Sequence, residues 1–261
     1  MNWLRRPYRR PRATVGLLAM LAAVIPMPHV AAAPLAQPVV SGYGRTIQFS
    51  GYSWLAKTAS VLVGPGPNYF SDAENSVWID AEERLHLRLT HDDIGRWYAS
   101  EVVLQDSLGY GTYQFIVDSP VDSLDPNVIL GLFTWSDNPA QNHREMDIEF
   151  GRWGNPAAPS GQYSVQPHEA AGNEVWFDPP RGATRTTHVL KWRTDRAAFS
   201  SVDDRDVFAA HVFEQGIPQP DGEQVRMNLW LDAGRAPTDG REAEVVINAF
   251  TFSPAGADAA L

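Results

Sequence analysis

The feature that most restricts the fold is a series of short β-branched and aromatic segments, separated by clusters of glycine and proline. The chain holds 20 glycines and 20 prolines, and we find no long helical period in it. Short apolar segments between such breakers are typical of strands in an all-β sandwich. We expect strands at 76–80, 85–90, 110–117, 128–135, 145–150, 225–231 and 244–252.

Several of these segments alternate between apolar and polar side chains. In the segment 145–150, apolar residues alternate with the carboxylates of Glu145, Asp147 and Glu149. Successive side chains of a strand point to opposite faces, so one face is apolar and the other polar. The same alternation recurs at 110–117, 162–166 and 227–231. We expect these strands to form one polar sheet surface with scattered aromatic residues. Ile116 is an exception, because it is apolar and stands on the polar side of its segment.

The carboxylates of Glu145, Asp147 and Glu149 lie two residues apart, about 7 Å along one side of a strand. They could form a solvated strand face or hold a calcium ion, which oxygen ligands suit. Alternatively, a like-charged neighbour can raise the pKa of one carboxyl group, so that it acts as an acid while another stays anionic. Leaning together, the carboxyl groups of Glu145 and Glu149 could approach within about 6 Å, which favours a retaining glycosidase.

The first 33 residues differ in composition from the rest of the chain. They hold five arginines and no acidic residue, then the apolar run 13–25, then small residues. This pattern predicts a secretory signal peptide, because the apolar run is shorter than the ~20 residues of a membrane span. An uncleaved anchor is the alternative. We expect a flexible lead-in at 34–43, one sandwich domain at 44–261, and secretion to the extracellular space or periplasm.

Charge and cysteine content narrow the possible partners. Taking the five leader arginines from 21 basic residues leaves 16, against 31 acidic residues, a formal charge of −15. Nucleic acid and anionic membranes bind basic surfaces, so neither is an expected partner. With no cysteine, the chain has neither disulfides nor thiolate metal sites. We expect a monomer that acts on a neutral polysaccharide or oligosaccharide without a catalytic cofactor; a structural calcium ion stays open.

The segment Arg144–Phe150, REMDIEF, resembles the signature strand of glycoside hydrolase family 16. This family includes licheninases, laminarinases and xyloglucan transglycosylases, and the segment lacks the extra bulge residue of laminarinases. The segment Tyr110–Gln114 is similar to the family's Tyr-Gly-x-Tyr-Glu strand, and Leu132–Trp135 stands at the expected distance before the signature. Met227–Trp230 is similar to the family's Asn-x-Trp strand. The resemblance thus covers residues 110–230.

The resemblance implies a jelly-roll sandwich of the concanavalin A-like lectin/glucanase type with a concave substrate cleft. It also implies that Glu145 is the nucleophile, Glu149 the general acid and base, and Asp147 their helper. The reaction would be endo-acting, retaining hydrolysis of a β-glucan. One departure concerns Gln114 and Ile116, which stand where family members often have Glu and then Arg in the cleft. Sugar binding could therefore be altered, with Gln114 as one contact.

Further substrate contacts are expected from residues that combine amide and indole groups. Asn228 and Trp230 share the polar face, so an indole could stack on a sugar while an amide binds hydroxyls. Trp135 could bind sugar or close the core. Gln166, before Pro167, and Asn68, in the loop 64–68, could each donate at the cleft or serve a turn. A lone histidine such as His143 or His168 is more often surface decoration than a ligand.

Other tryptophans lie outside the matching motifs. Trp192 is assigned to the core, and Trp97 and Trp176 are not assigned. Besides hydrolysis, the same sandwich could be a glycan-binding module without catalysis. The same carboxylates would also serve a transglycosylase, in which a sugar hydroxyl replaces water.

Overall fold

The computed structural model describes residues 41–204 and 206–256. The expected signal peptide at 1–33 and residues 34–40 of the lead-in lie outside this part of the chain. Residues 41–43, expected at the end of the lead-in, already belong to a strand. Residues 41–43 therefore belong to the sandwich and not to the lead-in.

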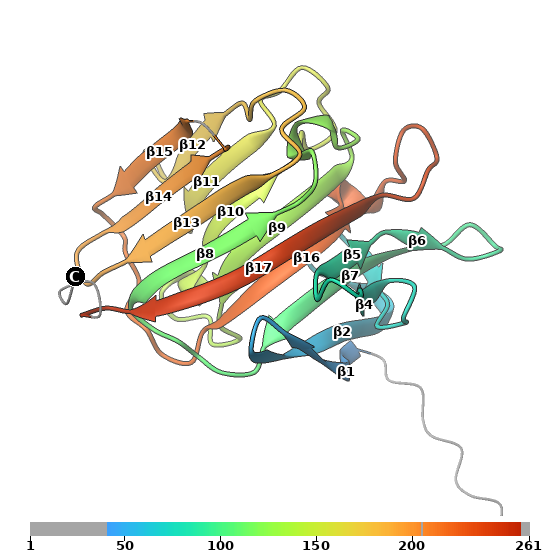
Figure 1. Cartoon of the computed structure of the whole chain (residues 1–261), viewed down its shortest axis with the longest axis horizontal. Helices are drawn as coiled ribbons and strands as arrows, with labels where there is room; N and C mark the ends of the chain where they lie inside the picture. Colours follow the sequence, from blue (N-terminus) through green and yellow to red (C-terminus); the bar gives the residue numbers. More distant parts are fainter. Residues whose placement is uncertain (1–40, 205, 257–261) are drawn as a thin grey trace, which may run out of the picture. The chain divides into compact units, whose positions relative to one another are not determined.

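The described residues form two sheets, as the strand pattern predicted (Figure 1). The ten-stranded sheet has the spatial order β1 (Ser41–Phe49), β2 (Tyr52–Val63), β3 (Asn68–Phe70), β7 (Trp97–Leu104), β16 (Gln224–Leu231), β9 (Val128–Trp135), β10 (Met146–Phe150), β11 (Gly161–Val165) and β12 (Glu174–Phe177), with β6 (Thr90–His91) paired to β7. The seven-stranded sheet has the order β15 (Val207–Phe213), β14 (Ala197–Val202), β13 (Thr186–Trp192), β8 (Gly111–Val117), β17 (Glu244–Pro254), β5 (Leu85–Arg88) and β4 (Val77–Ile79). Three short 3₁₀ turns occur at η1 (Val121–Ser123), η2 (Asn142–Arg144) and η3 (Asp232–Gly234).

The core lies between the two sheets and consists of the apolar faces of their strands. Met146, Ile148 and Phe150 are all buried there, opposite the carboxylates of the same segment. Trp192, assigned to the core from sequence, is fully buried, and its indole N–H donates to the carbonyl of Pro218. The expectation of an all-β jelly-roll sandwich is confirmed.

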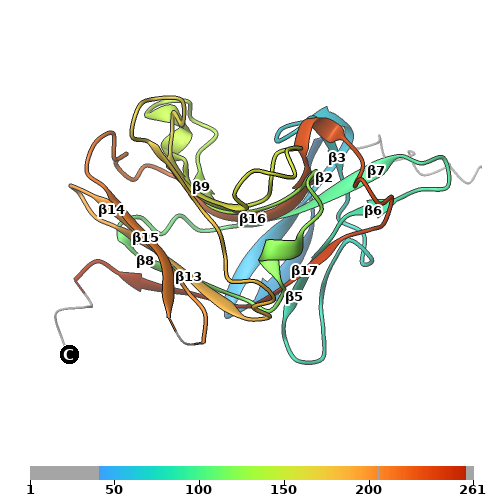
Figure 2. The ribbon, with the colours of Figure 1, turned by 90° about the horizontal axis from the view of Figure 1, so that it is seen from above.

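The ten-stranded sheet is curved, and Figure 2 shows the hollow side of β9 and β16 facing away from β13 and β17. Three of the four alternating segments, β10, β11 and the strand β16, belong to this concave sheet. Their polar sides share its outer face, because their apolar sides are in the core. This part of the expected polar surface is therefore correct.

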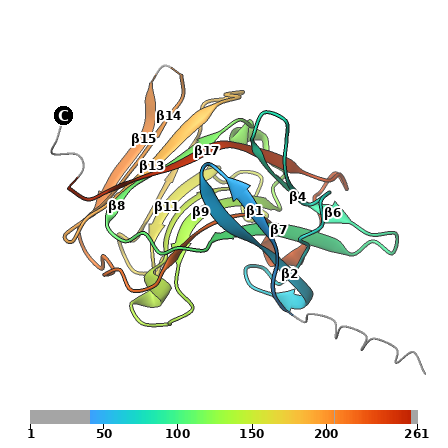
Figure 3. The same cartoon turned by 60° about the horizontal axis from the view of Figure 1, so that its bottom comes forward.

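The fourth alternating segment is in the other sheet, which corrects the expectation for Gln114 and Ile116. Strand β8 pairs with β13 and β17 in the seven-stranded sheet (Figure 3). Tyr113 and Phe115 point into the core, so Gln114 and Ile116 point out of the opposite side of the sandwich. Neither residue can contact a ligand in the concave cleft. Alternation alone could not reveal this, because strands of both sheets are half-buried in the same way.

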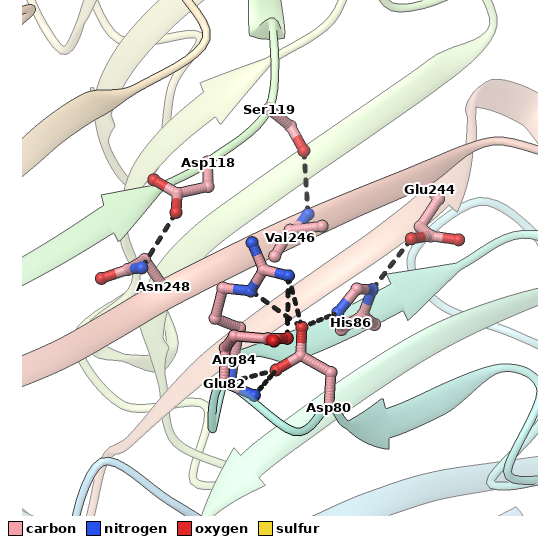
Figure 4. Close-up of polar contacts among 9 residues, drawn as sticks. All are labelled: Asp80, Glu82, Arg84, His86, Asp118, Ser119, Glu244, Val246 and Asn248. Carbon is pink, nitrogen blue, oxygen red and sulfur yellow. Dashed lines mark hydrogen bonds and ion pairs between the residues drawn. The ribbon is translucent and has the colours of Figure 1, made fainter.

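The outer face of the seven-stranded sheet carries its own polar cluster (Figure 4). The two ring nitrogens of His86 lie 2.9 Å from Asp80 and 2.8 Å from Glu244, and its ring stacks on Trp78. Arg84 also contacts Asp80. These charges are mutually paired, so this face is a satisfied polar surface remote from the carboxylate triplet.

Candidate active site

The floor of the concave sheet is organised in rows of paired residues that share one face. One row contains Glu101, Asn228, Gly131 and Glu149, contributed by β7, β16, β9 and β10. Gln162 and Trp176 continue this row through β11 and β12. Paired residues on neighbouring strands point to the same side of a sheet, so these side chains face the same cleft.

A second row runs beside the first and contains Asp147. Across the sheet it joins Arg226, Phe133, Asp147, Ser164 and Glu174. These strands bring together residues separated by more than 90 positions in the chain. The pairing in these two rows fixes the positions of Asp147 and Glu149 on the cleft face of the sheet.

Asp147 is the most firmly held of the three carboxylates. It is buried, and its Oδ2 accepts hydrogen bonds from Ser164 Oγ at 2.6 Å and Gln166 Nε2 at 3.2 Å. Its carboxyl group is also hydrogen-bonded to that of Glu145. From sequence, Gln166 is expected to contact substrate or to serve a turn. Its Nε2 donates to Asp147 and its Oε1 accepts from the N–H of His168 at 2.9 Å, and a contact with substrate stays a prediction.

Glu145 lies just before β10, after a left-handed turn whose residues 141–144 have φ between 50° and 59°. Such a conformation is strained for residues other than glycine and persists where other contacts hold it. Arg144 provides these contacts from a buried position. Its guanidinium donates to the carbonyls of Gln219 and Ala140 and pairs with Asp221 at 2.9 Å. Arg144 thus fixes the direction in which Glu145 enters the site.

The three carboxyl groups share an environment that resists ionisation. Burial, then the neighbouring Asp147 and Glu149, raise the pKa of Glu145, and Arg226 acts in the opposite direction. Burial also raises the pKa of Asp147, although the hydrogen bonds from Ser164 and Gln166 oppose it. Burial, then Asp147 and Glu174, raise the pKa of Glu149 well above its ordinary value. Burial and the neighbouring carboxylates therefore act together against ionisation of Glu145 and Glu149, which is not the environment of a solvated strand face.

A pocket of about 540 Å³ lies above this floor. It extends from the three carboxylates across β9 and β16 to β2 and β1, and its wall includes Trp135, Trp230, Asn228 and Tyr43. A mixed lining of aromatic and polar side chains is typical of small-molecule and sugar sites. The expected placement of Trp135, Trp230 and Asn228 at the cleft agrees with this lining; whether they bind substrate stays a prediction.

Asn228 is held at the centre of the pocket floor. Its Nδ2 donates to Glu101 Oε2 at 3.3 Å, and its Oδ1 is buried with no hydrogen-bond partner among the described residues. Glu101 is in turn held by Lys57 at 3.0 Å and Arg226 at 3.2 Å. Glu101 and its two cations therefore hold the Asn228 amide in a fixed position in the pocket wall.

Glu101, Lys57 and Arg226 are site residues that the sequence interpretation did not identify. Their side chains are between 1% and 12% exposed, so the two cations and the carboxylate form a buried ionic group in the cleft wall. Only Arg226 had a sequence signal, since it stands two residues before Asn228 and shares its face. Glu101 and Lys57 lie in strands outside the family-like motifs.

Trp135 and His143 form a stacked pair at the rim of the pocket. Their ring centroids are 4.1 Å apart at 9°, and Trp135 Nε1 donates to Asp137 Oδ1 at 3.1 Å. Asp137 also pairs with Arg226 at 3.3 Å. His143 therefore supports an aromatic residue of the site, whereas His168 is half-exposed beside Glu174.

The expectation that Asn68 donates at the cleft rim is wrong. Its amide is buried and fully used by the backbone, because Nδ2 donates to the carbonyls of Pro65 and Leu231 and Oδ1 accepts from the N–H of Leu231. The side chain joins the loop before β3 to the end of β16. The turn role considered as the alternative is the one that the structure shows.

Within residues 41–204 and 206–256, no group of three or more histidine, cysteine, aspartate or glutamate side chains is arranged to hold a metal ion. In the same part of the chain, no helix has the length and apolar character needed to cross a membrane.

Comparison with known proteins identifies the fold. No family model and no curated protein matches the chain. Among solved structures, the Bacillus licheniformis β-glucanase is 19% identical, with 84% of this chain and 99% of that chain covered and a TM-score of 0.59. A glycoside hydrolase family 16 endo-glucanase from Bacteroides ovatus is 14% identical, with 77% and 94% covered and a TM-score of 0.55.

A third similar structure carries a different description. It is an immunostimulatory antigen and pseudo β-1,3-glucanase of Mycobacterium tuberculosis, 18% identical, with 82% of this chain and 99% of that chain covered and a TM-score of 0.59. The similarity extends over nearly the whole length of all three structures. The chain therefore has the sandwich fold of the β-glucanases of glycoside hydrolase family 16, and the resemblance drawn from its sequence motifs is confirmed at the level of the fold.

Proposed function

We propose that this protein is an exported, endo-acting glycosidase that cleaves a β-linked glycan, a β-glucan in the first instance, with retention of configuration. The observation that carries the proposal is the group of Glu145, Asp147 and Glu149 at one end of an aromatic-lined pocket, in which Asp147 is buried and the two glutamates are partly buried. Two carboxyl groups with opposite protonation states are what glycoside hydrolysis requires.

In the first step, the carboxylate of Glu145 attacks the anomeric carbon and Glu149 gives its proton to the departing glycosidic oxygen. The glycosidic bond breaks as an ester bond forms between Glu145 and the sugar. In the second step, Glu149 removes a proton from water, and the resulting hydroxide displaces Glu145 from the anomeric carbon. The two inversions give net retention.

Asp147 has a distinct part in this sequence. The hydrogen bond with Asp147 raises the pKa of Glu145, so the proton that the two carboxyl groups share has to move to Asp147 before Glu145 attacks as an anion. Ser164 and Gln166 hold Asp147 in place for this exchange. The positive charge of Arg226 also favours the anionic form of Glu145, because it lowers the pKa of that carboxyl group.

Turnover on a panel of polymers tests the proposal. Wild-type protein, Glu145→Gln and the exposed control Glu214→Gln are incubated with barley β-glucan, laminarin, xyloglucan and agarose, and reducing ends and product masses are measured. We expect products from the wild type and the control but not from Glu145→Gln. Absence of wild-type products on every polymer would contradict hydrolysis.

A glycan-binding module without catalysis is the second candidate function. A protein of this fold is described as a pseudo β-1,3-glucanase, so the fold alone does not imply turnover. This candidate predicts equal binding of oligosaccharides by the wild type and Glu145→Gln, with no products. Transglycosylation is distinguished by a labelled sugar acceptor, which would appear in lengthened products.

The proposal of export depends on residues 1–33 and has its own test. The full-length chain is expressed in a bacterial host, and the mature protein is recovered from the periplasm or medium. Its intact mass is expected to correspond to cleavage after Ala32 or Ala36, because Pro34 directly follows the alanine triplet. Recovery of the uncleaved chain in the membrane fraction would instead indicate an anchor.

A further inference from the structure

Trp176 lies on the side of the carboxylates that is remote from the pocket. Gln162 pairs with both Glu149 and Trp176, so the three side chains point from the same face of the sheet. Two strand spacings separate β10 from β12, roughly 10 Å, which is about the length of two linked pyranose rings. The side chain of Trp176 is 38% exposed although it stands on the floor of the cleft.

Neighbouring groups fix the orientation of this indole. Trp176 Nε1 donates to Glu174 Oε2 at 2.6 Å, and Gln162 Nε2 donates to the other carboxylate oxygen of Glu174. The ring of Trp153 meets Trp176 edge-on, with centroids 4.8 Å apart at 76°. A rigid aromatic ring that is already oriented loses little conformational freedom when a ligand binds.

We propose that Trp176, held by Trp153 and Glu174, is a stacking platform for a pyranose unit of the glycan on the β12 side of the carboxylates. The inference rests on the proposed function and locates a part of the substrate that the pocket on the other side does not accommodate. The apolar face of a β-linked pyranose stacks on the indole, and Glu174 and Gln162 bind hydroxyl groups at its edge.

The platform has a consequence for the mode of cleavage. The pocket with Asn228 and Trp230 lies on one side of Glu149, and Trp176 lies on the other. A glycan bound to both runs across the carboxylates, so the scissile bond is internal to the chain. This arrangement is what endo-acting cleavage needs.

Binding to a silenced protein tests the platform without relying on turnover. Isothermal titration compares Glu145→Gln with the double variants that also carry Trp176→Ala or Trp176→Phe. The ligands are cello-, laminari- and mixed-linkage gluco-oligosaccharides of increasing length. We expect Trp176→Ala to weaken binding of the longest ligands about tenfold and that of the shortest not at all, because only long ligands reach β12. Trp176→Phe, which keeps a flat ring, should retain most of the affinity.

The control variant is Trp78→Ala, which removes a partly exposed tryptophan from the opposite sheet and should change no affinity. Circular dichroism verifies that each variant is folded. Equal affinity of Trp176→Ala and its parent for every ligand length would overturn the platform. So would a complete failure of any oligosaccharide to bind the parent.

Turnover separates the platform from the proposed reaction. If the wild type cleaves a polymer, Trp176→Ala should raise KM about tenfold with little change in kcat, because the lost contact is remote from the reacting atoms. An unchanged KM would contradict the platform. If the wild type cleaves nothing but its binding depends on Trp176, the proposed hydrolysis fails and the platform stands.

Discussion

Asn228 and Glu149 share one row of the cleft floor, and the residue between them is Gly131, which has no side chain. Gly131 pairs with Asn228 on one side and with Glu149 on the other. A Cβ atom at position 131 would lie 2.5 Å from Asn228 Oδ1. The glycine therefore leaves the space that the amide oxygen of Asn228 occupies, and a side chain at position 131 would displace that amide.

Substitution of this glycine tests whether the position of the Asn228 amide is needed. We expect Gly131→Ala to displace the Asn228 amide and lower kcat/KM about tenfold, since about 1.4 kcal/mol of transition-state binding would be lost. Steady-state kinetics on the best polymer measures the effect. Gly95→Ala, in the turn between β6 and β7 and outside the pocket, is the control, because a Cβ there meets no atom within 4 Å. Equal losses in both variants would contradict a specific role for the position of that amide.

The two glutamates are distinguished by the leaving group. Glu149→Gln removes the general acid, so cleavage of polymers should fall about 10²- to 10⁴-fold. From an aryl glycoside with an acidic phenol, the phenolate leaves without being protonated. The first step of the reaction should therefore still occur in Glu149→Gln and appear as a burst of released phenol. Glu145→Gln, which lacks the nucleophile, should show no burst. Stopped-flow absorbance measures both, and a burst from Glu145→Gln would reverse the assigned roles.

The burial of Glu149 predicts a dependence of stability on pH. Burial, Asp147 and Glu174 raise the folded-state pKa of Glu149 above its ordinary value of 4.5. A raised pKa stabilises the folded state below pH 4.5, and this stabilisation is lost as the pH rises toward the folded-state pKa. Glu149→Gln should therefore gain Tm relative to the wild type between pH 5 and pH 8, with the gain increasing with pH. A gain independent of pH would contradict this cause.

The ionic group around Glu101 predicts a large loss of stability when its carboxylate is removed. Glu101→Ala leaves Lys57 and Arg226 buried without their shared partner, which costs about 3–5 kcal/mol of unfolding free energy. Glu242, which pairs with Arg88 at a partly exposed site, is the control, and Glu242→Ala should cost at most about 1 kcal/mol. Urea unfolding at pH 7 measures both. Comparable losses would mean that burial does not decide the effect.

A buried histidine predicts acid sensitivity of the fold. Burial lowers the pKa of His188 from 6.5 to about 3. Its ring nitrogens lie 2.8 Å from the hydroxyls of Thr186 and Ser201, which suits a neutral ring. Below pH 6.5, His188 binds a proton in the unfolded chain but stays neutral in the folded chain. The free energy of unfolding therefore falls as the pH drops from 6.5 toward 3.

The slope of that fall is measurable. At most about 1.4 kcal/mol per pH unit comes from this one group. His188→Gln should be less stable at pH 7, because it loses hydrogen bonds, yet should show a smaller slope between pH 6.5 and 3. His91→Gln, at a half-exposed site, should leave the slope unchanged. An unchanged slope in His188→Gln would show that other groups cause the acid sensitivity.

Local patterns in the sequence correctly predicted much of the fold. The expected strand 128–135 has the bounds of β9, and 145–150 includes β10 with one residue before it. Alternation also separated Met146, Ile148 and Phe150, which are in the core, from the carboxylates. These features depend on neighbours in the chain, because a strand with one buried face must repeat every two residues.

The chain by itself thus determined the all-β class, the strand that carries Glu145, Asp147 and Glu149, and the sides on which their neighbours lie. Only the tertiary structure decided which sheet each strand joins. In the folded protein, Gln114 lies outside the cleft and the Asn68 amide is hydrogen-bonded to the backbone. Glu101 lies beside Asn228, 127 residues away in sequence. The reason is physical: alternation specifies two faces, but the pairing of distant strands, driven by burial of a shared core, decides which polar faces meet.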